Sequence, residues 1–488
     1  MATEVPATST TTSGAFSLET RGIEIVDEGE RKGRPRDLFW PWFAANVSVL
    51  GIAYGAFILA FGVSFWQGVF AAVVGTAFSF LLVGFVALSG KSASVPTMIV
   101  SRAPFGVRGN ALPTAVSYVL LVGWETALTA LATLATATVF DRLGVGGGNA
   151  TKIIAFLVVA AVVVAAGVLG FDVILRLQLF LTIALGVLTL VYIALTAKDV
   201  HWGVVSALPA GSGQAVLGAL VFAMTALGLG WVNAGGDYSR YLPRSASGRG
   251  VVWWTTFGGS IAPIVLILWG LLLAGSDQEF AQKLAADPIG ALTTLLPTWF
   301  LVPFALVAVG GIIAGAVLDI YSSGLNLLTL GVRIPRYVAA GIDGVLMVLG
   351  TIYVVWVAND FLGPFQGFLI TLGVPMAAWC GIFLADLYLR RGRYAESELF
   401  SPAGRYGPVN AGAVGTMVVA TLVGWGLVTN TYASWLSWQG YLLGPLGLGG
   451  KEGAWAFANL GVLFALVLGA LGYAATSAGR VRRQQETA

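Results

Sequence analysis

The chain has very few residues that could build a disulfide, a zinc site or a hydrolytic catalytic set. Its 488 residues include one cysteine, Cys380, and one histidine, His201. One cysteine excludes an internal disulfide, and zinc sites are built mainly from several Cys and His ligands, so we expect no metal centre. A Ser-His-Asp arrangement would have to use His201, which lies in a predicted loop beside Lys198 and Asp199, where a solvated histidine is the simpler interpretation. We therefore expect neither an enzyme nor a cofactor.

Charged residues are scarce as well. They make up 10% of the chain, whereas soluble domains carry about 25%, and hydrophobic residues make up 57%. This balance predicts an integral membrane protein surrounded by the lipid bilayer. The net charge of +3 does not predict a nucleic-acid partner, because basic residues in such a protein follow the membrane topology.

Apolar runs recur along the chain at the length of a membrane-spanning helix, about 20 residues. These runs cover 38–62, 66–90, 112–140, 152–170, 172–196, 214–236, 253–275, 300–328, 337–358, 362–388, 410–432 and 455–478. They predict an all-α fold of twelve transmembrane helices in one membrane domain over residues 38–478. Residues 1–37 and 479–488 are expected to be tails.

The flanking segments predict the orientation in the membrane. Residues 1–37 are polar, lack a signal-peptide pattern, and are expected to be largely disordered. This tail ends in basic residues, which beside membrane spans usually stay in the cytoplasm. With the N-terminus inside, the opposite side receives only Arg142, Lys152, Lys198, Lys283 and Lys451. We therefore expect both termini on the cytoplasmic side of the plasma (inner) membrane.

The sixth predicted span loses its regular apolar pattern part-way through. Around Gly230 and Gly235 it becomes glycine-rich, and it ends in charged and aromatic residues. Unpaired peptide groups are costly in hydrocarbon, so a helix break at this depth indicates a buried cavity, which in transporters usually holds the substrate. The first span has a matching interruption, with Gly51 and Gly55 as its predicted breaks.

Matching breaks in two halves of a membrane protein indicate an inverted repeat. We predict repeat one over about 38–196, repeat two over about 214–388, and two extra helices over about 410–478. Five spans in each repeat give the two halves opposite orientations, as alternating access requires. No residue-level repeat is visible, so this prediction rests on the breaks and the number of spans.

Two tryptophans lie beside glycines in these spans. Trp124 follows Gly123 in the third span, and Trp231 follows Gly230 in the sixth. Their indole faces could sandwich a flat aromatic ligand, and core packing is the alternative in a chain with 16 Trp residues. Glu125 points about 100° away from Trp124 around the helix. It either reaches the same cavity, as an acceptor or a proton carrier, or it is a buried structural acid.

Asp319 lies within the eighth span, where an ionisable group is costly and usually faces a cavity or a partner. We predict that it carries a proton, and a structural acid bonded to backbone or hydroxyl groups is the alternative. Asn233 offers donors and acceptors that suit an amide-like ring edge, or it bridges the broken helix. Asp237 and Arg240, at the cytoplasmic end of span six, are expected to be gate or ion-pair residues rather than ligands.

Several short motifs occur in order along residues 19–430. They are Glu19-Thr20-Arg21-Gly22-Ile23-Glu24, Ser101-Arg102-Ala103-Pro104-Phe105-Gly106-Val107-Arg108-Gly109, Gly123-Trp124, Trp231 with Asp237-Tyr238-Ser239-Arg240-Tyr241-Leu242-Pro243, and Tyr321-Ser322 with Pro335-Arg336. Together they resemble the motifs of the purine–cytosine permeases in nucleobase:cation symporter family 1. The resemblance implies a LeuT-like fold of five plus five helices and two more, which imports a nucleobase or related heterocycle with Na⁺ or H⁺. It also implies that Trp124 and Trp231 hold the ring, and that Asp319 replaces an Asn that contacts the base.

The chain departs from this family pattern at two places. Sodium-coupled members carry Ser or Thr hydroxyls in span eight shortly before that Asn, whereas this chain has Ile313-Ala314-Gly315-Ala316. An amide-bearing residue often found near the span-three Trp is not evident here, while Glu125 is present. Both departures favour H⁺ over Na⁺ as the coupling ion.

We therefore predict a secondary active transporter that imports a nucleobase, cytosine first and purines next, by H⁺ symport through alternating access. The alternatives within transport are a Na⁺-coupled symporter and a carrier of a related heterocycle such as pyridoxine, hydantoin or allantoin. A channel or a membrane-embedded enzyme is the alternative from another class. Unsaturable passive flux would reveal the channel, and a convergent set of catalytic groups would reveal the enzyme.

Overall fold

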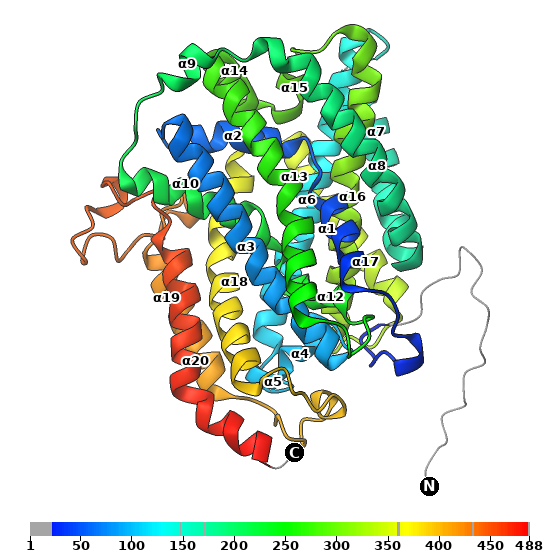
Figure 1. The fold of residues 1–488 in the computed structure, drawn as a ribbon, viewed down its shortest axis with the longest axis vertical. Helices are drawn as coiled ribbons and strands as arrows, with labels where there is room; N and C mark the ends of the chain where they lie inside the picture. Colours follow the sequence, from blue (N-terminus) through cyan, green and yellow to red (C-terminus); the bar gives the residue numbers. More distant parts are fainter. Residues whose placement is uncertain (1–21, 147, 170, 359–361, 432–433, 487–488) are drawn as a thin grey trace.

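The computed structural model describes residues 22–486 apart from 147, 170, 359–361 and 432–433, and in these residues it is a bundle of helices (Figure 1). The long helices are α3 (Phe65–Ala93), α6 (Ala111–Arg142), α7 (Gly148–Leu169), α8 (Phe171–Thr196), α13 (Gly248–Ser276), α16 (Leu301–Thr329), α17 (Arg336–Ile352), α18 (Leu362–Arg390) and α20 (Leu460–Glu486). We call the face with α9 (Trp202–Ser206), α14 (Gln278–Ala286) and α15 (Pro288–Thr293) the upper face. The face with α4 (Thr97–Val100), α5 (Arg102–Phe105) and the end of α20 is the lower face.

The apolar helices follow the predicted runs. Ten helical segments of the described chain are long and apolar enough to cross a membrane, or up to eleven if the pair Pro35–Asn46 and Leu50–Leu59, bent by 69°, is one span. The shorter apolar helix α19 (Ala411–Gly426) coincides with the eleventh predicted run. Every predicted run therefore contains a helix, while the count of twelve spans stays a prediction.

Local sequence signals begin and end several of these helices. Ser64 and Gln67 form a capping box at the start of α3, in which each side chain accepts a hydrogen bond from the other residue's backbone N–H. Asp277 caps α14 by accepting from the N–H of Glu279 at 2.8 Å. Gly331, just after α16, has a φ of +98°, which glycine adopts at little cost.

The first span is broken between α1 (Phe39–Asn46) and α2 (Leu50–Leu59). The predicted break residues Gly51 and Gly55 lie inside α2 instead, because their role is close packing. A Cβ on Gly51 would lie 2.9 Å from the Leu266 side chain, and one on Gly55 would lie 2.4 Å from backbone atoms of Gly270 and Leu271. Small residues let two helix backbones approach in this way. The interruption is therefore in the predicted span but earlier than these glycines.

The sixth span is broken after α10 (Gly213–Ala226), at Leu227. It continues as α11 (Gly228–Trp231), a 3-10 turn η4 (Val232–Ala234) and α12 (Gly235–Ser239). Gly235 begins α12, whereas Gly230 lies inside α11, away from the break at Leu227. The predicted break at Gly230 is thus displaced by three residues, and that glycine instead makes room for a neighbouring side chain.

Residues 22–37 differ from the predicted disordered tail, because they pack on the lower face. The buried Arg31 donates to the Leu242 carbonyl at 2.8 Å, the Ser94 hydroxyl at 2.7 Å and the Lys91 carbonyl at 2.5 Å. A cation beside the end of α3 satisfies carbonyls that the helix leaves free. The predicted C-terminal tail over 479–488 is likewise helical as far as Glu486. The rest of the N-terminal prediction, residues 1–21, lies outside the described residues.

Gly270→Val is expected to destabilise the protein strongly. A Cβ at this position would lie 1.9 Å from the Ile52 carbonyl oxygen, and that backbone moves only if α2 moves away from α13. Overpacking costs about 1–3 kcal/mol or more, so the purified protein should have a lower Tm. Gly341→Val in α17 is the control, since nothing lies within 4 Å of its added Cβ. Equal Tm values for the two variants would contradict the close contact of α2 with α13.

Candidate functional site

A small buried cavity lies between the two broken spans and the long helices beside them. Its volume is about 50 Å³, which is room for a few water molecules at roughly 10–15 Å³ each. It is lined by Ala45, Asn46, Ser48, Leu50, Gly51, Tyr54, Trp124, Leu128, Ala226, Leu227, Trp231, Pro263, Gly311, Gly315 and Asp319. We call it the central cavity. Three of the five predicted substrate-binding residues, Trp124, Trp231 and Asp319, therefore line one space.

Trp124 in α6 is held edge-on by two phenylalanines of α18. Its ring centroid lies 5.2 Å from that of Phe365 and 6.3 Å from that of Phe368, with the planes nearly perpendicular. A Cβ added to Gly230 would lie 3.0 Å from the Trp124 Nε1, so the glycine makes room for the indole. The Nε1–H is buried and has no hydrogen-bond partner among the described residues. It is a donor available to a ligand in the central cavity.

Trp231, at the end of α11, is supported by Trp42 of α1. The two indoles meet edge to face, with centroids 5.8 Å apart and planes at 87°. Trp42 also meets Tyr238 edge to face at 5.4 Å and is fully buried, so it fixes the ring of Trp231 from below. Trp42 does not itself line the central cavity, and it is a supporting residue that sequence patterns alone did not indicate. The proposed sandwich of a ring between Trp124 and Trp231 stays a prediction.

Asp319 brings a carboxyl group to the central cavity from α16. The residue is 1% exposed, and its Oδ2 has no hydrogen-bond partner in the part of the chain that the structure describes. A buried polar atom without a partner is costly unless a proton, water or ligand satisfies it. The carboxyl is therefore placed to bind a proton or to accept a hydrogen bond from a substrate.

Glu125 does not line the central cavity. It is fully buried on another side of α6, where the nearby polar groups are Ser323 and Asp343, with Asp319 still close enough to interact electrostatically. Asp343 in α17 in turn accepts hydrogen bonds from Tyr118 at 2.6 Å and Ser323 at 3.0 Å. The turn of about 100° between adjacent helical residues separates Glu125 from Trp124, which sends the two side chains to different neighbours. In this conformation Glu125 is therefore not placed to contact a substrate in the central cavity.

Asn233 also lies outside the cavity lining and joins helices instead. Its side-chain amide donates to the Ser117 hydroxyl of α6 at 2.7 Å, and Asn326 of α16 donates to the same oxygen at 2.5 Å. Its Oδ1 is buried and has no hydrogen-bond partner among the residues that the structure describes. Of the two predicted roles, this geometry matches the bridge next to the broken helix.

The cavity lining includes residues that the sequence analysis had not chosen as ligands. Asn46 lies at the end of α1, where its amide donates to the Trp42 carbonyl at 2.8 Å, and Ser48 and Tyr54 follow at the break and on α2. They fall in the same interrupted stretch as Gly51, which was the signal for them. Leu128, one helical turn after Trp124, carried no polar or aromatic signal.

Residues 25–444 match the family model described as a permease for cytosine/purines, uracil, thiamine, allantoin. The chain belongs to this permease family. It is 26% identical over 410 residues to YxlA of Bacillus subtilis, a protein assigned to the purine-cytosine permeases, covering 81% of this chain and 85% of that protein. It is 24% identical over 499 residues to a purine-cytosine permease of Saccharomyces cerevisiae, covering 93% of this chain and 87% of that one.

The fold of the permease is similar to that of Mhp1, a nucleobase-cation-symport-1 family transporter solved in a closed conformation with bromovinylhydantoin bound. The TM-score is 0.70 at 18% identity, covering 97% of this chain and 100% of that one. An inward-facing structure of Mhp1 matches with a TM-score of 0.67. The predicted LeuT-like helical membrane fold is therefore confirmed, and the chain is a multi-pass membrane transporter of a permease family rather than an enzyme.

Towards the lower face of the permease, span six is hydrogen-bonded to neighbouring segments through Asp237 and Arg240. Asp237 accepts from the Thr97 N–H at 2.8 Å, the Thr97 hydroxyl at 2.7 Å and the Ser322 hydroxyl at 2.8 Å. Arg240 donates to the Gly22 carbonyl at 3.0 Å and to the Tyr321 hydroxyl at 3.0 Å. Both residues thus tie span six to α16, as residues of a gate would.

Ion pairs outside the membrane spans reinforce these links in the permease. Arg244 pairs with Glu28 of the N-terminal segment and with Glu396, at 2.5 Å, of the segment after α18. The Arg244 hydrogen bond lowers the pKa of the Glu28 carboxyl, and the bond to Glu396 raises the pKa of Arg244. Burial lowers the pKa of Arg102 to about 10. This side chain donates to the carbonyls of Leu399 and Thr329.

Within the described ranges, no three His, Cys, Asp or Glu side chains gather as a metal site.

Proposed function

We infer that this permease imports a nucleobase by H⁺ symport, with cytosine as the first candidate and purines next. It would lie in the plasma (inner) membrane with its lower face and both termini in the cytoplasm. The observation that carries this proposal is the placement of Asp319, Trp124 and Trp231 around one buried cavity, with one Asp319 oxygen unpartnered by any described group. Two indoles suit a flat ring, and a buried carboxyl can exchange a proton when its access to water changes.

The contact between α16 and the break in span one supports H⁺ rather than Na⁺ as the coupling ion. A Cβ on Gly311 would lie 2.8 Å from the Val47 carbonyl oxygen, and one on Gly315 would lie 3.5 Å from the Ala45 carbonyl oxygen. Carbonyls of broken helices bind Na⁺ in other transporters with further oxygen ligands nearby. The two glycines facing these carbonyls supply no side-chain oxygen, so a Na⁺ ion would have few ligands here.

Alternating access would require the lower links to break. Span six is joined to α16 by the Asp237–Ser322 and Arg240–Tyr321 hydrogen bonds, and to α6 by the Asn233–Ser117 bond. Each link consists of one or a few hydrogen bonds, worth about 0.5–1.5 kcal/mol net and more for charged groups. Such a set can hold the cytoplasmic side closed and still open on a functional timescale.

Uptake driven by a pH gradient tests the coupling ion. In liposomes that contain the purified protein, labelled cytosine should accumulate when the exterior is one pH unit more acidic, with no Na⁺ present. At one H⁺ per substrate that gradient supports about tenfold accumulation. A Na⁺ gradient at equal pH on both sides is the control and should give none. Accumulation that requires Na⁺ and ignores pH would overturn H⁺ coupling.

A carrier of a related heterocycle is the second candidate. The family description supports this alternative, because it names uracil, thiamine and allantoin beside cytosine and purines. The central cavity of about 50 Å³ would have to widen for any of these rings, and it would have to widen most for a larger ligand such as thiamine. Competition of labelled cytosine uptake by unlabelled adenine, uracil, allantoin, a hydantoin and pyridoxine would rank these substrates. Stronger competition by a non-nucleobase would replace cytosine as the first candidate.

A further inference from the structure

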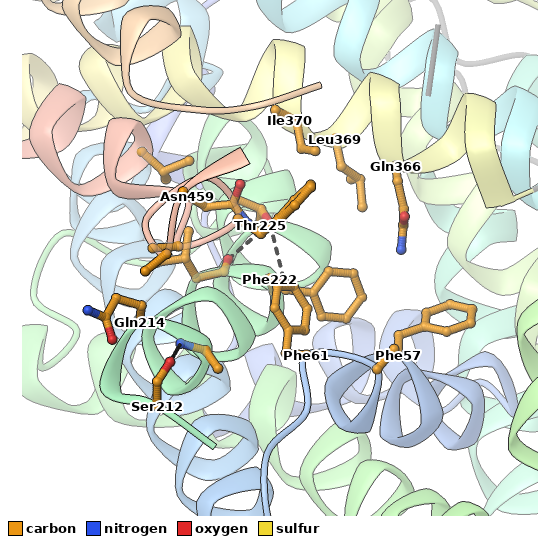
Figure 2. Close-up of a pocket in the computed structure, with 18 residues that line it drawn as sticks. Phe57, Phe61, Ser212, Gln214, Phe222, Thr225, Gln366, Leu369, Ile370 and Asn459 are labelled. Atoms are coloured by element: carbon orange, nitrogen blue, oxygen red, sulfur yellow. Dashed lines mark hydrogen bonds between the residues drawn. The ribbon is translucent and has the colours of Figure 1, made fainter. Parts of the chain in front are cut away.

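A second and larger cavity lies on the upper side of the central cavity. Its volume is about 630 Å³, which is within the ~300–1,000 Å³ of typical small-molecule sites. We call it the vestibule, and Figure 2 shows its lining residues as sticks. The lining comes from α2, α10 and α18 and from the segment before α20. The cavity that has the size of a ligand site is therefore not the one predicted from the sequence.

The vestibule and the central cavity are consecutive along two helices. On α2, Tyr54 lines the central cavity and Phe57, three residues on, lines the vestibule. On α10, Ala226 lines the central cavity, while Phe222 lines the vestibule. Residues three or four apart lie about one turn, 5.4 Å, along a helix. A molecule in the vestibule would thus lie about one helical turn from the central cavity.

One wall of the vestibule is aromatic. Phe222 has its ring centroid 6.1 Å from those of both Phe57 and Phe61, and it meets Tyr54 edge to face at 5.8 Å. Phe57 and Phe222 are almost fully buried, whereas Phe61 is half-buried and presents more of its ring to the space. Aromatic walls of this kind bind flat rings by stacking or edge contacts.

A side-chain amide faces this wall from α18. Figure 2 shows the Gln366 amide pointing into the space on the side of Phe57, and no dashed hydrogen bond reaches it from the residues drawn. Two other polar side chains of the lining are already engaged: the Ser212 hydroxyl accepts from the Ala215 N–H at 3.2 Å, and the Thr225 hydroxyl donates to the Val221 carbonyl at 3.0 Å. Gln214 and Asn459 are the further amides of the lining, and Figure 2 shows them away from Phe57. A Gln amide offers a donor and an acceptor together, which matches the amide-like edge of a nucleobase.

The segment that leads into the last helix, α20, also contributes to the vestibule. Phe457 and Asn459, just before α20, line it opposite α18. The segment is packed tightly on α10, since a Cβ on Gly218 would lie 2.4 Å from the Phe457 carbonyl oxygen. Asn459 holds a left-handed backbone, with φ of +54°, which Asn tolerates better than most residues. The segment before α20 thus completes the vestibule with residues outside the predicted repeat.

We propose that the vestibule is a second, upstream binding site for the transported heterocycle, which holds the ring against Phe61 and Phe222 and its polar edge at the Gln366 amide. The ligand class is a flat, uncharged heterocycle with adjacent donor and acceptor atoms, so the inference rests on the proposed function. The site loads the central cavity by raising the concentration of substrate beside it. Its affinity is lower than that of the central cavity, because its lining holds no charged group, whereas Asp319 lines the central cavity.

Binding stoichiometry of the full-length protein tests this site. Wild-type protein should bind two molecules of labelled cytosine, and Trp231→Ala should leave the weaker site. Phe61→Ala with Gln366→Ala should instead remove the weaker site, keep central binding, and raise the KM of uptake about tenfold at unchanged kcat. Phe464→Ala with Gln278→Ala, at an exposed ring of α20 and an exposed residue of α14, is the matched control and should behave as wild type.

The possible results separate this inference from the function on which it rests. One bound molecule in wild-type protein, lost entirely in Trp231→Ala, would overturn the vestibule site and leave the transport proposal standing. An unchanged KM and stoichiometry in the Phe61, Gln366 double variant would overturn it as well. Absence of binding of cytosine and adenine to the wild-type protein would overturn both proposals. Two sites, one of them removed only by the vestibule variants, would establish it.

Discussion

Asp319→Asn is expected to abolish proton-driven accumulation of substrate while leaving the protein folded. The amide has nearly the same size and still hydrogen-bonds, but it cannot take up and release a proton. A pH difference of one unit that supports about tenfold accumulation in the wild-type protein should therefore support none in the variant. The measurement is uptake of labelled cytosine into liposomes with an acidic exterior. Exchange of labelled for unlabelled substrate without a gradient should persist, because it needs no net proton movement.

Two further variants show whether this loss is specific. Asp141→Asn, at an exposed position near the end of α6, is the matched control, and liposomes containing this variant should accumulate substrate normally. Glu125→Gln tests the other predicted proton carrier, which lies beside Ser323 and Asp343 away from the central cavity. Loss of coupling in Glu125→Gln alone would move the proton to that buried group. Wild-type accumulation and an unaltered pH profile in Asp319→Asn would return Asp319 to a structural role.

Trp231→Ala is expected to cause the largest loss of substrate affinity. Stacking of a base on an aromatic ring is worth about 1–3 kcal/mol by alanine substitution, which corresponds to roughly 5- to 150-fold in Kd. The loss should fall in the upper part of that range, because Trp42 holds the ring in place and its removal leaves a gap beside Trp42. Equilibrium binding of labelled cytosine to the purified protein measures it.

Conservative substitutions separate the contribution of Trp231 to substrate affinity from that of Trp124. Trp231→Phe should retain part of the affinity through stacking. Trp124→Phe keeps an aromatic face but removes the Nε1–H, which no described group accepts, so it should weaken binding only if the substrate takes that hydrogen bond. Trp299→Ala, at a ring that is 66% exposed, is the control. Unchanged affinity in both Trp231→Ala and Trp124→Ala would refute the sandwich.

Sequence patterns located the site through unusual residues rather than through its complete lining. The broken sixth span, the Trp next to Gly230 and the charged Asp319 each violate what a lipid-facing helix requires, and such violations are readable without a structure. Ordinary residues carry no such mark. Leu128 and Tyr54 line the central cavity, and Phe61 and Phe222 line the vestibule, yet each suits any membrane helix.

The assignment of the glycines went wrong for a related reason. The sequence pattern predicts helix breaks at Gly51, Gly55 and Gly230, but each of these glycines lies in a helix and accommodates a neighbour at close range. The sequence does not distinguish a glycine that allows a turn from a glycine that allows another helix to pack closely. Only the position of Leu266, Gly270 and Trp124 in space distinguishes the two.

The sequence by itself determined that this is a helical membrane protein with two interrupted spans, because the length and apolarity of each run are set by the bilayer. It also placed the chain in a family, through motifs in order. Tertiary structure decided which side chains share a space. The rotation of α6 sends Trp124 to the central cavity and Glu125 to α17. The packing of the segment before α20 near α2, α10 and α18 forms the vestibule. Those outcomes depend on contacts between residues far apart in the chain, which local periodicity does not encode.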